Sequence, residues 1–186
     1  MHKWLCDTTI NRVLKCFSNN TPGVAMLGYP LKDGETPHTL LVSTFYFESL
    51  KSSGMLRISE WLAKIPIDTI QRMIIPLFSN HHWSLSVVYP KLGLGVVLDP
   101  LRPYHKEVSK ILLQHSGVEV VLYNESVVQQ TNSSDCGIYT LYYTGCLVSK
   151  KIHRLFQPVP AEFIKLMREE QLASEEAEKE QETLSD

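Results

Sequence analysis

A block of basic residues is missing from this sequence. Its 18 Lys and Arg residues are offset by 20 Asp and Glu residues, which leaves a formal net charge of -2 at pH 7. Proteins that bind the phosphate backbone of a nucleic acid carry a patch or stripe of positive charge. The balanced charge therefore argues against the usual nucleic-acid-binding classes, and we expect no nucleic-acid partner.

Motifs for metal ions and disulfides are missing as well. The four cysteines, Cys6, Cys16, Cys136 and Cys146, form no CxxC pair, and no HxxxH pair occurs. A chain of 186 residues with four cysteines is too large and too poor in cysteine for a disulfide scaffold. Structural zinc needs clustered ligands. We expect free thiols in a reducing compartment, with no metal and no cofactor.

Long apolar runs are also absent. No stretch approaches the roughly 20 apolar residues that a membrane span needs. The first residues lack the charged, apolar and small-residue order of a signal peptide. We therefore expect no membrane partner and an intracellular protein, either cytoplasmic or nuclear.

The residues that are present suffice for one packed domain of the α+β class. Apolar residues at helical spacing follow Asp7, a residue type favoured at helix N-caps. The segment Thr39–Leu50 begins with a strand pattern and continues with a helical one. His82–Tyr89 and Leu94–Asp99 flank the turn "PKLG", which predicts an antiparallel hairpin. The other elements expected are a strand at 72–78, a helix at 104–115, a strand at 118–123 and a helix at 136–148.

The C-terminal segment is acidic and has no aromatic residue. We interpret "EEQLASEEAEKEQETLSD" as a solvated helix extension or a frayed tail, because this composition can bury little apolar surface. The segment should carry no chemistry. The chain is therefore divided into a domain at residues 1–158 and a C-terminal helix and acidic tail at residues 159–186.

A lone cysteine stands where "QQTNSSDCGIYTLYY" changes from small polar residues to apolar helical spacing. The polar residues at 133–135 are N-cap types, so Cys136 should lie in the first turn of a helix. Unpaired N–H groups and the positive end of the helix dipole favour a thiolate there, and Gly137 should leave room for a substrate backbone. The alternative is a small buried apolar residue at the start of a helix. The cysteine alone leaves both interpretations open.

A cysteine nucleophile also needs a base, a group that orients the base and an oxyanion donor. His82 begins one strand of the predicted hairpin and Asp99 ends the other, so antiparallel pairing should bring them together. Gln130 and the backbone N–H of Cys136 could supply the oxyanion donors. Each residue also has a simpler interpretation: His82 as a surface histidine, Asp99 as a turn residue and Gln130 as a solvated loop side chain. His81 should point to the opposite strand face and take no part.

Three segments, "HHWSLSVVYP", "GVVLDP" and "QQTNSSDCGIYT", resemble in order and spacing the signature of the ubiquitin-like-protein proteases. These are the cysteine peptidases of the sentrin/SUMO-specific and adenovirus-protease clan. The resemblance implies His82 as base, Asp99 as its orienter, Cys136 as nucleophile and Gln130 as oxyanion donor. It also implies a papain-like-superfamily fold, in which helices flank a central mixed or antiparallel sheet. The resemblance runs from Trp4 to about Val148, and we place the catalytic domain at residues 1–158.

The resemblance extends to the N-terminus, where "WLCDTTIN" is similar to the family's Trp-Leu-Asn-Asp segment, with Cys6 in place of the usual Asn. By position, it implies that Trp4 and Trp83 form a flat tunnel over the Gly-Gly tail of a modifier. It likewise implies that Asp7 meets a basic residue of that modifier. The simpler interpretation of both tryptophans is core packing.

The resemblance implies a monomeric cysteine protease that cleaves after the C-terminal Gly-Gly of ubiquitin or a ubiquitin-like modifier such as SUMO or NEDD8. The order His, Asp, Cys differs from the Cys, His, Asn order of papain itself. Two alternatives stay open: a related acetyltransferase that uses the same three residues, and a non-catalytic domain that holds the modifier. The sequence also leaves open a eukaryotic regulator or a secreted effector acting in the cytosol of a host cell.

Overall fold

A computed structural model gives the structure of the protein, and it describes residues 4–63, 65–101, 105–115 and 117–183. Within these ranges, no helix is both long enough and apolar enough to cross a bilayer.

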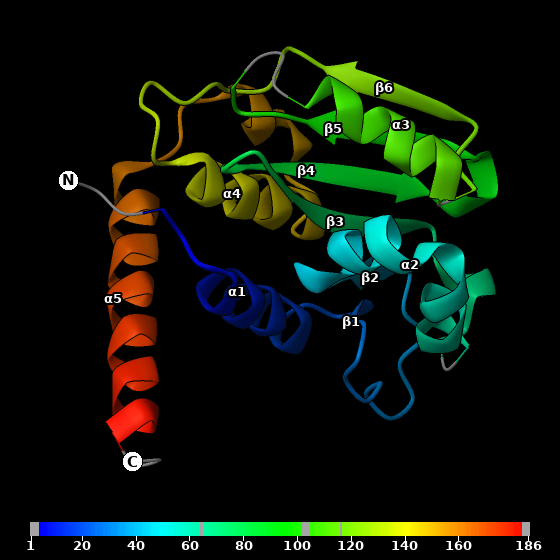
Figure 1. The fold of residues 1–186 in the computed structure, drawn as a ribbon, viewed down its shortest axis with the longest axis horizontal. Helices are drawn as coiled ribbons and strands as arrows, with labels where there is room; N and C mark the ends of the chain where they lie inside the picture. Colours follow the sequence, from blue (N-terminus) through cyan, green and yellow to red (C-terminus); the bar gives the residue numbers. More distant parts are fainter. Residues whose placement is uncertain (1–3, 64, 102–104, 116, 184–186) are drawn as a thin grey trace.

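A six-stranded mixed sheet forms the centre of the molecule, with the strands in sequence order (Figure 1). The first three strands pair in parallel, the third to fifth pair antiparallel, and the last two pair in parallel. The predicted antiparallel hairpin and the α+β class are both confirmed. The strands are β1 Val24–Met26, β2 Thr39–Leu41, β3 Arg72–Ser79, β4 His82–Tyr89, β5 Leu94–Leu98 and β6 Val120–Asn124.

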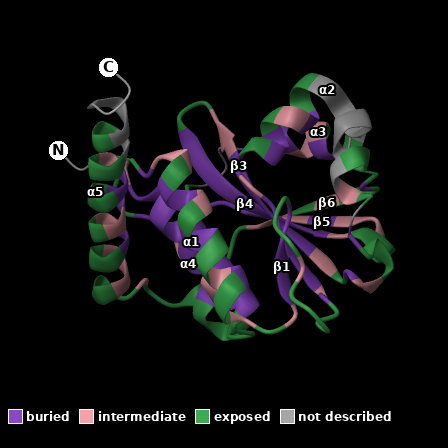
Figure 2. Cartoon of the chain, turned by 90° about the horizontal axis from the view of Figure 1, so that it is seen from below, coloured by how far each residue is buried: buried purple, intermediate pink, exposed green. Residues whose placement is uncertain are grey.

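Helices cover both faces of this sheet, and each face has its own apolar core (Figures 1 and 2). One core lies under the first and fourth α-helices, which the fifth braces from the side, and the other lies under the second and third. The α-helices are α1 Asp7–Asn20, α2 Phe45–Leu62, α3 Lys106–His115, α4 Cys136–Val148 and α5 Ala161–Thr183. Three short 3-10 helices are η1 Ile67–Thr69, η2 Pro90–Leu92 and η3 Ile152–Phe156.

Alternation along β4 sends its side chains to opposite faces of the sheet. Trp83, Leu85 and Val87 belong to the core shared with α4, as the alternating pattern predicted. Val88 belongs to the core on the other face. His82 has the same parity as Val88, so it points away from the Trp83 side at the very start of the strand.

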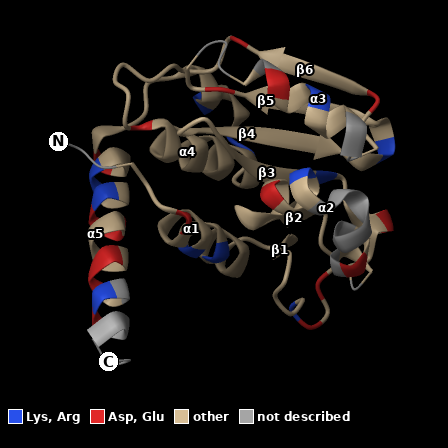
Figure 3. Cartoon of the chain, viewed as in Figure 1, with Lys and Arg blue, Asp and Glu red and all other residues tan. Residues whose placement is uncertain are grey.

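Helix α4 has the predicted bounds but is buried on nearly every side (Figure 2). Its apolar spacing predicted one buried face. The other side is buried too because α1, α5 and η3 pack against it. The helix carries no charged residue, whereas α5 is rich in Glu and Lys on its exposed surface (Figure 3). A helix that is buried on all sides has no solvent-facing side for charged residues, which accounts for the uncharged sequence of α4.

The acidic C-terminal segment is helical to Thr183, and the expectation that it buries little is wrong at two positions. Gln171 and Ser174 are both buried. Their side chains hydrogen-bond to the buried hydroxyl of Thr9 on α1, at 3.0 Å each. Polar side chains are tolerated in the interior when they find such partners, and composition alone does not reveal them.

Several element boundaries differ from prediction by one or two residues: β3 ends at Ser79 rather than at residue 78, and β5 ends at Leu98 rather than at Asp99. The helix expected at 104–115 begins at Lys106, and residue 104 lies outside the described residues. The strand expected at 118–123 runs from Val120 to Asn124. Differences of one or two residues are usual at element ends, where hydrogen bonds rather than side-chain pattern set the limit.

Candidate active site

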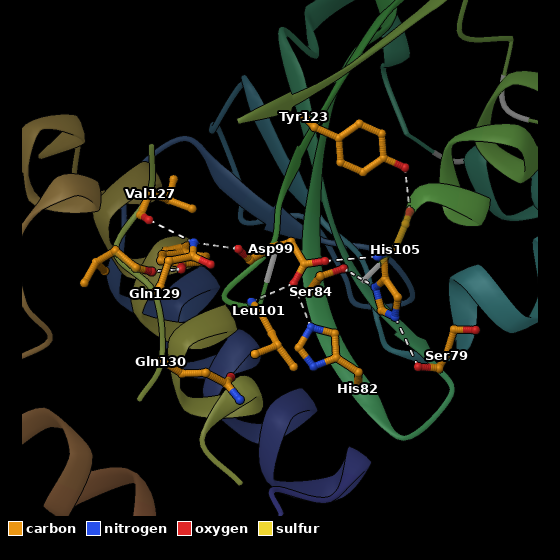
Figure 4. Close-up of polar contacts among 12 residues, drawn as sticks. Ser79, His82, Ser84, Asp99, Leu101, His105, Tyr123, Val127, Gln129 and Gln130 are labelled. Carbon is orange, nitrogen blue, oxygen red and sulfur yellow. Dashed lines mark hydrogen bonds and ion pairs between the residues drawn. The ribbon is translucent and has the colours of Figure 1, made fainter. Parts of the chain in front are cut away.

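The His82 ring meets the Asp99 carboxylate at one end of the β4–β5 hairpin (Figure 4). Nε2 of His82 lies 2.7 Å from Oδ1 of Asp99, and both side chains are buried. The antiparallel pairing brings the first residue of β4 beside the residue that follows β5. The predicted meeting of these two side chains is confirmed.

The partners of His82 favour its charged form. Burial by itself lowers the pKa of this imidazole, but hydrogen bonds to Asp99 and Cys136, and the charges of these two groups, outweigh burial and raise the pKa to about 9. An imidazole with that pKa is protonated at neutral pH. The site is therefore suited to a thiolate–imidazolium pair, the reactive form of a cysteine nucleophile.

Backbone groups hold the Asp99 carboxylate in place. Its Oδ1 also accepts a hydrogen bond from the Leu101 N–H at 2.9 Å, and its Oδ2 accepts one from the His105 N–H at 3.1 Å. The Gln129 side chain donates to the Asp99 carbonyl at 3.0 Å. With the carboxylate fixed in this way, the bond to His82 fixes the orientation of the imidazole.

His105 is a site residue that the sequence did not indicate. Its ring lies 4.9 Å from the His82 ring, centroid to centroid, and its Nε2 donates to the Ser79 carbonyl at 3.1 Å (Figure 4). Burial and the charge of His82 lower the pKa of His105 despite the Ser79 hydrogen bond. The neutral ring then accepts at Nδ1 from the Ser84 hydroxyl at 2.6 Å. No local motif marks His105, because only the folded chain brings it back to Asp99.

His82, Asp99 and His105 also form a cluster of metal-ligand types, with ligand atoms within 4.8 Å of one another. Both ring nitrogens of His105 are engaged, however, by Ser84 and Ser79. Oδ1 of Asp99 is engaged by His82. The donor set is thus used for hydrogen bonds inside the protein, and the geometry fits an orienting network better than a metal centre.

Cys136 is the first residue of α4, where the sequence predicted it. Asp135 occupies the N-cap position but makes no side-chain capping bond, and its carbonyl accepts the N–H of Tyr139 at 3.0 Å. The first N–H groups of the helix are therefore not taken by a side-chain cap from Asp135. The Cys136 side chain also hydrogen-bonds to His82, which places the thiol beside the imidazole.

The room expected beside Gly137 is filled by the protein itself, so that expectation is wrong. A β-carbon at this position would lie 2.9 Å from Cβ of Leu5 and 3.3 Å from Cδ1 of Trp83. Glycine is required here because the segment before α1 packs directly on the first turn of α4. The Trp83 side chain is also bonded to the backbone of Leu5, since its indole N–H donates to the Leu5 carbonyl at 3.1 Å.

Gln130 lies in the loop before α4 and is buried. Its Nε2 donates to the Asn132 carbonyl at 2.5 Å, and its backbone N–H donates to the Pro100 carbonyl at 3.0 Å. Its Oε1 has no hydrogen-bond partner among the described residues. A glutamine amide has two N–H bonds, so one proton remains for a developing oxyanion.

The two tryptophans implied for substrate binding differ in exposure. Trp4 is 38% exposed, and its indole N–H donates to the Ser133 carbonyl at 2.9 Å, which anchors it to the loop before Cys136. Trp83 is 2% exposed and packs against Phe78 with ring centroids 4.6 Å apart. The tunnel role of both stays a prediction.

Asp7 is the first residue of α1, and Cys6 rather than Asp7 holds the N-cap position. The predicted cap is therefore displaced by one residue. The side chain of Cys6 makes no capping bond to the helix backbone, and its sulfur lies 3.3 Å from the Thr9 hydroxyl instead. The backbone N–H of Cys6 donates to Oε1 of Gln171 at 3.0 Å.

His81 does not lie in a strand, so the reason given for setting it aside is wrong. Asn80 and His81 form a two-residue turn between β3 and β4, with φ of 49° and 59°. Positive φ at both positions is the geometry of tight hairpin turns. The His81 ring lies 5.7 Å from the Trp4 ring, centroid to centroid.

Residues 3–179 match the profile of the "Ulp1 protease family, C-terminal catalytic domain". The chain belongs to this family. The match takes in α5 as far as residue 179, and membership places the chain among the cysteine-type peptidases. Among curated relatives, Sentrin-specific protease 2 of Rattus norvegicus is 26% identical over 166 residues, which cover 81% of this chain and 26% of the relative. The chain thus spans about a quarter of the length of the relatives it matches.

Solved structures show the same fold. The C-terminal Ulp1 protease domain in complex with Smt3, the yeast ortholog of SUMO, superposes with a TM-score of 0.61 at 23% identity, covering 79% of this chain and 66% of that one. The Xanthomonas campestris effector XopD bound to ubiquitin superposes with a TM-score of 0.68 at 15% identity, covering 93% and 92%. The mixed sheet flanked by helices is therefore the fold of the Ulp1 family.

Proposed function

We propose that the chain is a monomeric, intracellular cysteine protease that cleaves the bond after the C-terminal Gly-Gly of ubiquitin or a ubiquitin-like modifier. The observation that carries this proposal is the buried His82–Asp99 pair, hydrogen-bonded onward to Cys136 at the first turn of α4. Membership of the Ulp1 family supports the reaction class.

In the first half of the reaction, the Cys136 thiolate attacks the carbonyl carbon of the last glycine. The oxyanion that forms is stabilised by the Cys136 backbone N–H and the free proton of the Gln130 amide. Protonated His82 gives its proton to the leaving amine as the C–N bond breaks. The product is a thioester between the modifier and Cys136.

In the second half, a water molecule takes the place of the amine. His82, now neutral, removes a proton from this water as the oxygen attacks the thioester carbonyl. The C–S bond breaks, and the thiolate and imidazolium are restored. Asp99 orients the imidazole in both halves, because hydrogen bonds from the Leu101 and His105 backbone N–H groups fix its carboxylate.

Binding of the modifier tail is assigned to Trp4, Trp83 and Asp7. The support for Trp4 is its exposed ring, tied by Ser133 to the loop that precedes the nucleophile. Asp7 at the start of α1 presents a carboxylate on the same N-terminal segment. The Ulp1 domain holds Smt3 and XopD holds ubiquitin, so modifiers of both kinds are candidate substrates.

A panel of ubiquitin, SUMO and NEDD8 probes with a C-terminal electrophile tests this function. We expect at least one probe to add covalently to the wild-type chain and none to add to the Cys136→Ala variant, as read by a gel shift. The probe that reacts fastest identifies the preferred modifier. A folded wild-type chain that reacts with no probe would contradict the proposal. That result is the one expected of an acetyltransferase or of a non-catalytic binding domain.

A further inference from the structure

The C-terminal helix reaches the residue next to the nucleophile. Arg168 on α5 forms an ion pair with Oδ1 of Asp135, the residue that precedes Cys136. The side chains are only 19% and 10% exposed. Removing one partner of such a part-buried pair leaves a charge that solvent compensates only in part, which is more costly than the loss of a fully exposed pair.

The same ion pair ends a chain of hydrogen bonds through the loop before α4. Oδ2 of Asp135 accepts from the Asn132 side chain at 2.8 Å, and Oδ1 of Asn132 accepts from the N–H groups of Ser134 and Asp135 at 2.9 and 3.0 Å. The Asn132 carbonyl accepts from Gln130. Arg168 is therefore connected, bond by bond, to the side chain assigned as oxyanion donor.

Helix α5 also contacts the N-terminal segment that carries Trp4 and Cys6. Less than one turn after Arg168, Oε1 of Gln171 accepts from the Cys6 N–H and from the Thr9 hydroxyl, at 3.0 Å each. Cys6 follows Trp4 by two residues. In Figure 1, α5 lies across the N-terminal ends of both α1 and α4, so one helix braces the two segments that flank the nucleophile.

Arg168 also has an electrostatic effect, because it compensates the negative charge of Asp135. The Asp135 carboxylate makes no capping bond to α4, so no N–H group of the helix is hydrogen-bonded to it. Asp135 directly precedes Cys136 in the chain. An unpaired negative charge on Asp135 would oppose a thiolate on Cys136, whereas the guanidinium of Arg168 compensates that charge.

We propose that Arg168 is a positioning residue for the nucleophile, which holds Asp135 at the start of α4 and cancels its charge beside the Cys136 thiolate. The proposal rests on the proposed function, in which Cys136 is the attacking group. The acidic C-terminal helix then belongs to the support of the active site, although it contributes no group to the reaction itself.

The test is the pH dependence of Cys136 alkylation by iodoacetamide, measured on the Cys136 peptide by mass spectrometry. Arg168→Gln leaves Asp135 unpaired, so the pH midpoint should rise and the rate at pH 6 should fall about three- to tenfold. Asp135→Asn leaves Arg168 unpaired, so the midpoint should move to lower pH. The double variant has neither charge and should return close to the wild-type midpoint, as should the single variant Arg168→Lys.

Arg12→Ala is the matched control, because it removes the exposed ion pair between α1 and Glu170 of α5 without touching the nucleophile loop. Its profile should match the wild type, and the exposed Cys16 serves as an internal standard in every sample. Shifts of opposite sign in the two charge variants cannot arise from loosened packing alone. If Arg168→Gln does not fold, the direction of the midpoint shift in Asp135→Asn still tests the proposal.

Unchanged midpoints in the folded charge variants, or shifts of the same sign, overturn the proposal. Because alkylation needs no modifier, this result is independent of the probe panel. Opposite shifts in a chain that no probe labels would leave the role of Arg168 standing and remove the proposed protease activity instead.

Discussion

Cys136 and Cys146 lie on the same helix and differ in the groups around them rather than in burial. Their residues are 1% and 4% exposed. Burial raises the pKa of Cys146, and the hydrogen bond to Tyr142 and the charges of Arg154 and Lys151 offset this only in part. At the other end of α4, the charge and hydrogen bond of Cys136 help to raise the pKa of His82 to about 9. Equal burial thus accompanies an ordinary core thiol in one case and a thiol paired with a base in the other.

The ends of α4 explain the contrast. Cys136 stands at the positive end of the helix dipole, where N–H groups are available. Cys146 stands in the last turn, where carbonyls accumulate, and its own carbonyl accepts the N–H of Lys151 at 2.8 Å. The thiolate of Cys146 is disfavoured in these surroundings, whereas the thiol of Cys136 has a base as its hydrogen-bond partner. The place of a cysteine along a helix is therefore more informative about reactivity than its burial.

Replacing each of these two cysteines by alanine should give the largest difference in turnover between two matched variants. Cys136→Ala should abolish turnover of a fluorogenic modifier substrate while largely preserving modifier binding, because the docking surface does not depend on the sulfur. Cys146→Ala should keep kcat and lose about 1 kcal/mol of unfolding free energy in urea, the cost of less buried apolar surface. Replacing Cys6 or Cys16 should also leave turnover intact. Turnover by Cys136→Ala, or an equal loss in Cys146→Ala, would break the comparison.

Removing the charge of Asp99 should make Cys136 behave more like Cys146. Asp99→Asn should lower kcat by about 10⁴-fold, because the imidazole loses both its orienter and the charge that stabilises its protonated form. Covalent probe capture should slow with it, while non-covalent modifier binding should survive. Near-native turnover in a folded Asp99→Asn protein would leave Asp99 as only a turn residue.

The same variant has a pH signature with a defined sign. Because the folded pKa of His82 is raised to about 9, its protonated form adds stability below the ordinary value of 6.5, and this stability is lost as the pH rises through about 9. In Asp99→Asn the loss should occur at lower pH, and the alkaline limb of kcat/KM should move the same way. An alkaline limb that stays in place would show that it reports another group.

A smaller effect should follow from Gln130, which has no counterpart near Cys146. Gln130→Ala should lower kcat about 10²- to 10³-fold with little change in KM, since the amide acts on the oxyanion and not on the bound substrate. Alkylation of Cys136 should be unchanged, because that reaction forms no oxyanion. A loss confined to KM would instead assign Gln130 to substrate binding.

The smallest effect is expected at Asp7, which tests whether the substrate surface extends from α4 to α1. Asp7→Asn should raise KM a few-fold at low salt with kcat nearly unchanged, and the difference should shrink at high salt. Because Asp7 is the first residue of α1, the Asp7→Asn variant should also lose about 0.3–1 kcal/mol of favourable interaction with the helix dipole. An unchanged KM at low salt would leave Asp7 with the helix role alone.

The sequence determined the elements that depend on local pattern. Alternation from His82 to Tyr89 and the turn that follows define the hairpin, and this pairing is enough to bring His82 to Asp99. The polar run before Cys136 likewise defines the start of α4. Period-two alternation and N-cap composition act over a few residues, so they can be read without knowing the fold.

Tertiary structure alone decided the features that depend on contacts between distant segments. His105 reaches Asp99 only because the chain folds back after β5, and Gly137 is required only because Leu5 packs upon it. The sequence predicted that the acidic C-terminal segment would be solvated, yet Gln171 from this segment bonds to Cys6, and Arg168, just before it on α5, pairs with Asp135. A buried polar contact needs a partner at a fixed distance, and that partner lies more than 30 residues away in the sequence for Arg168 and more than 160 for Gln171. Local composition carries no record of such a partner, so only the folded chain makes these groups part of the active site.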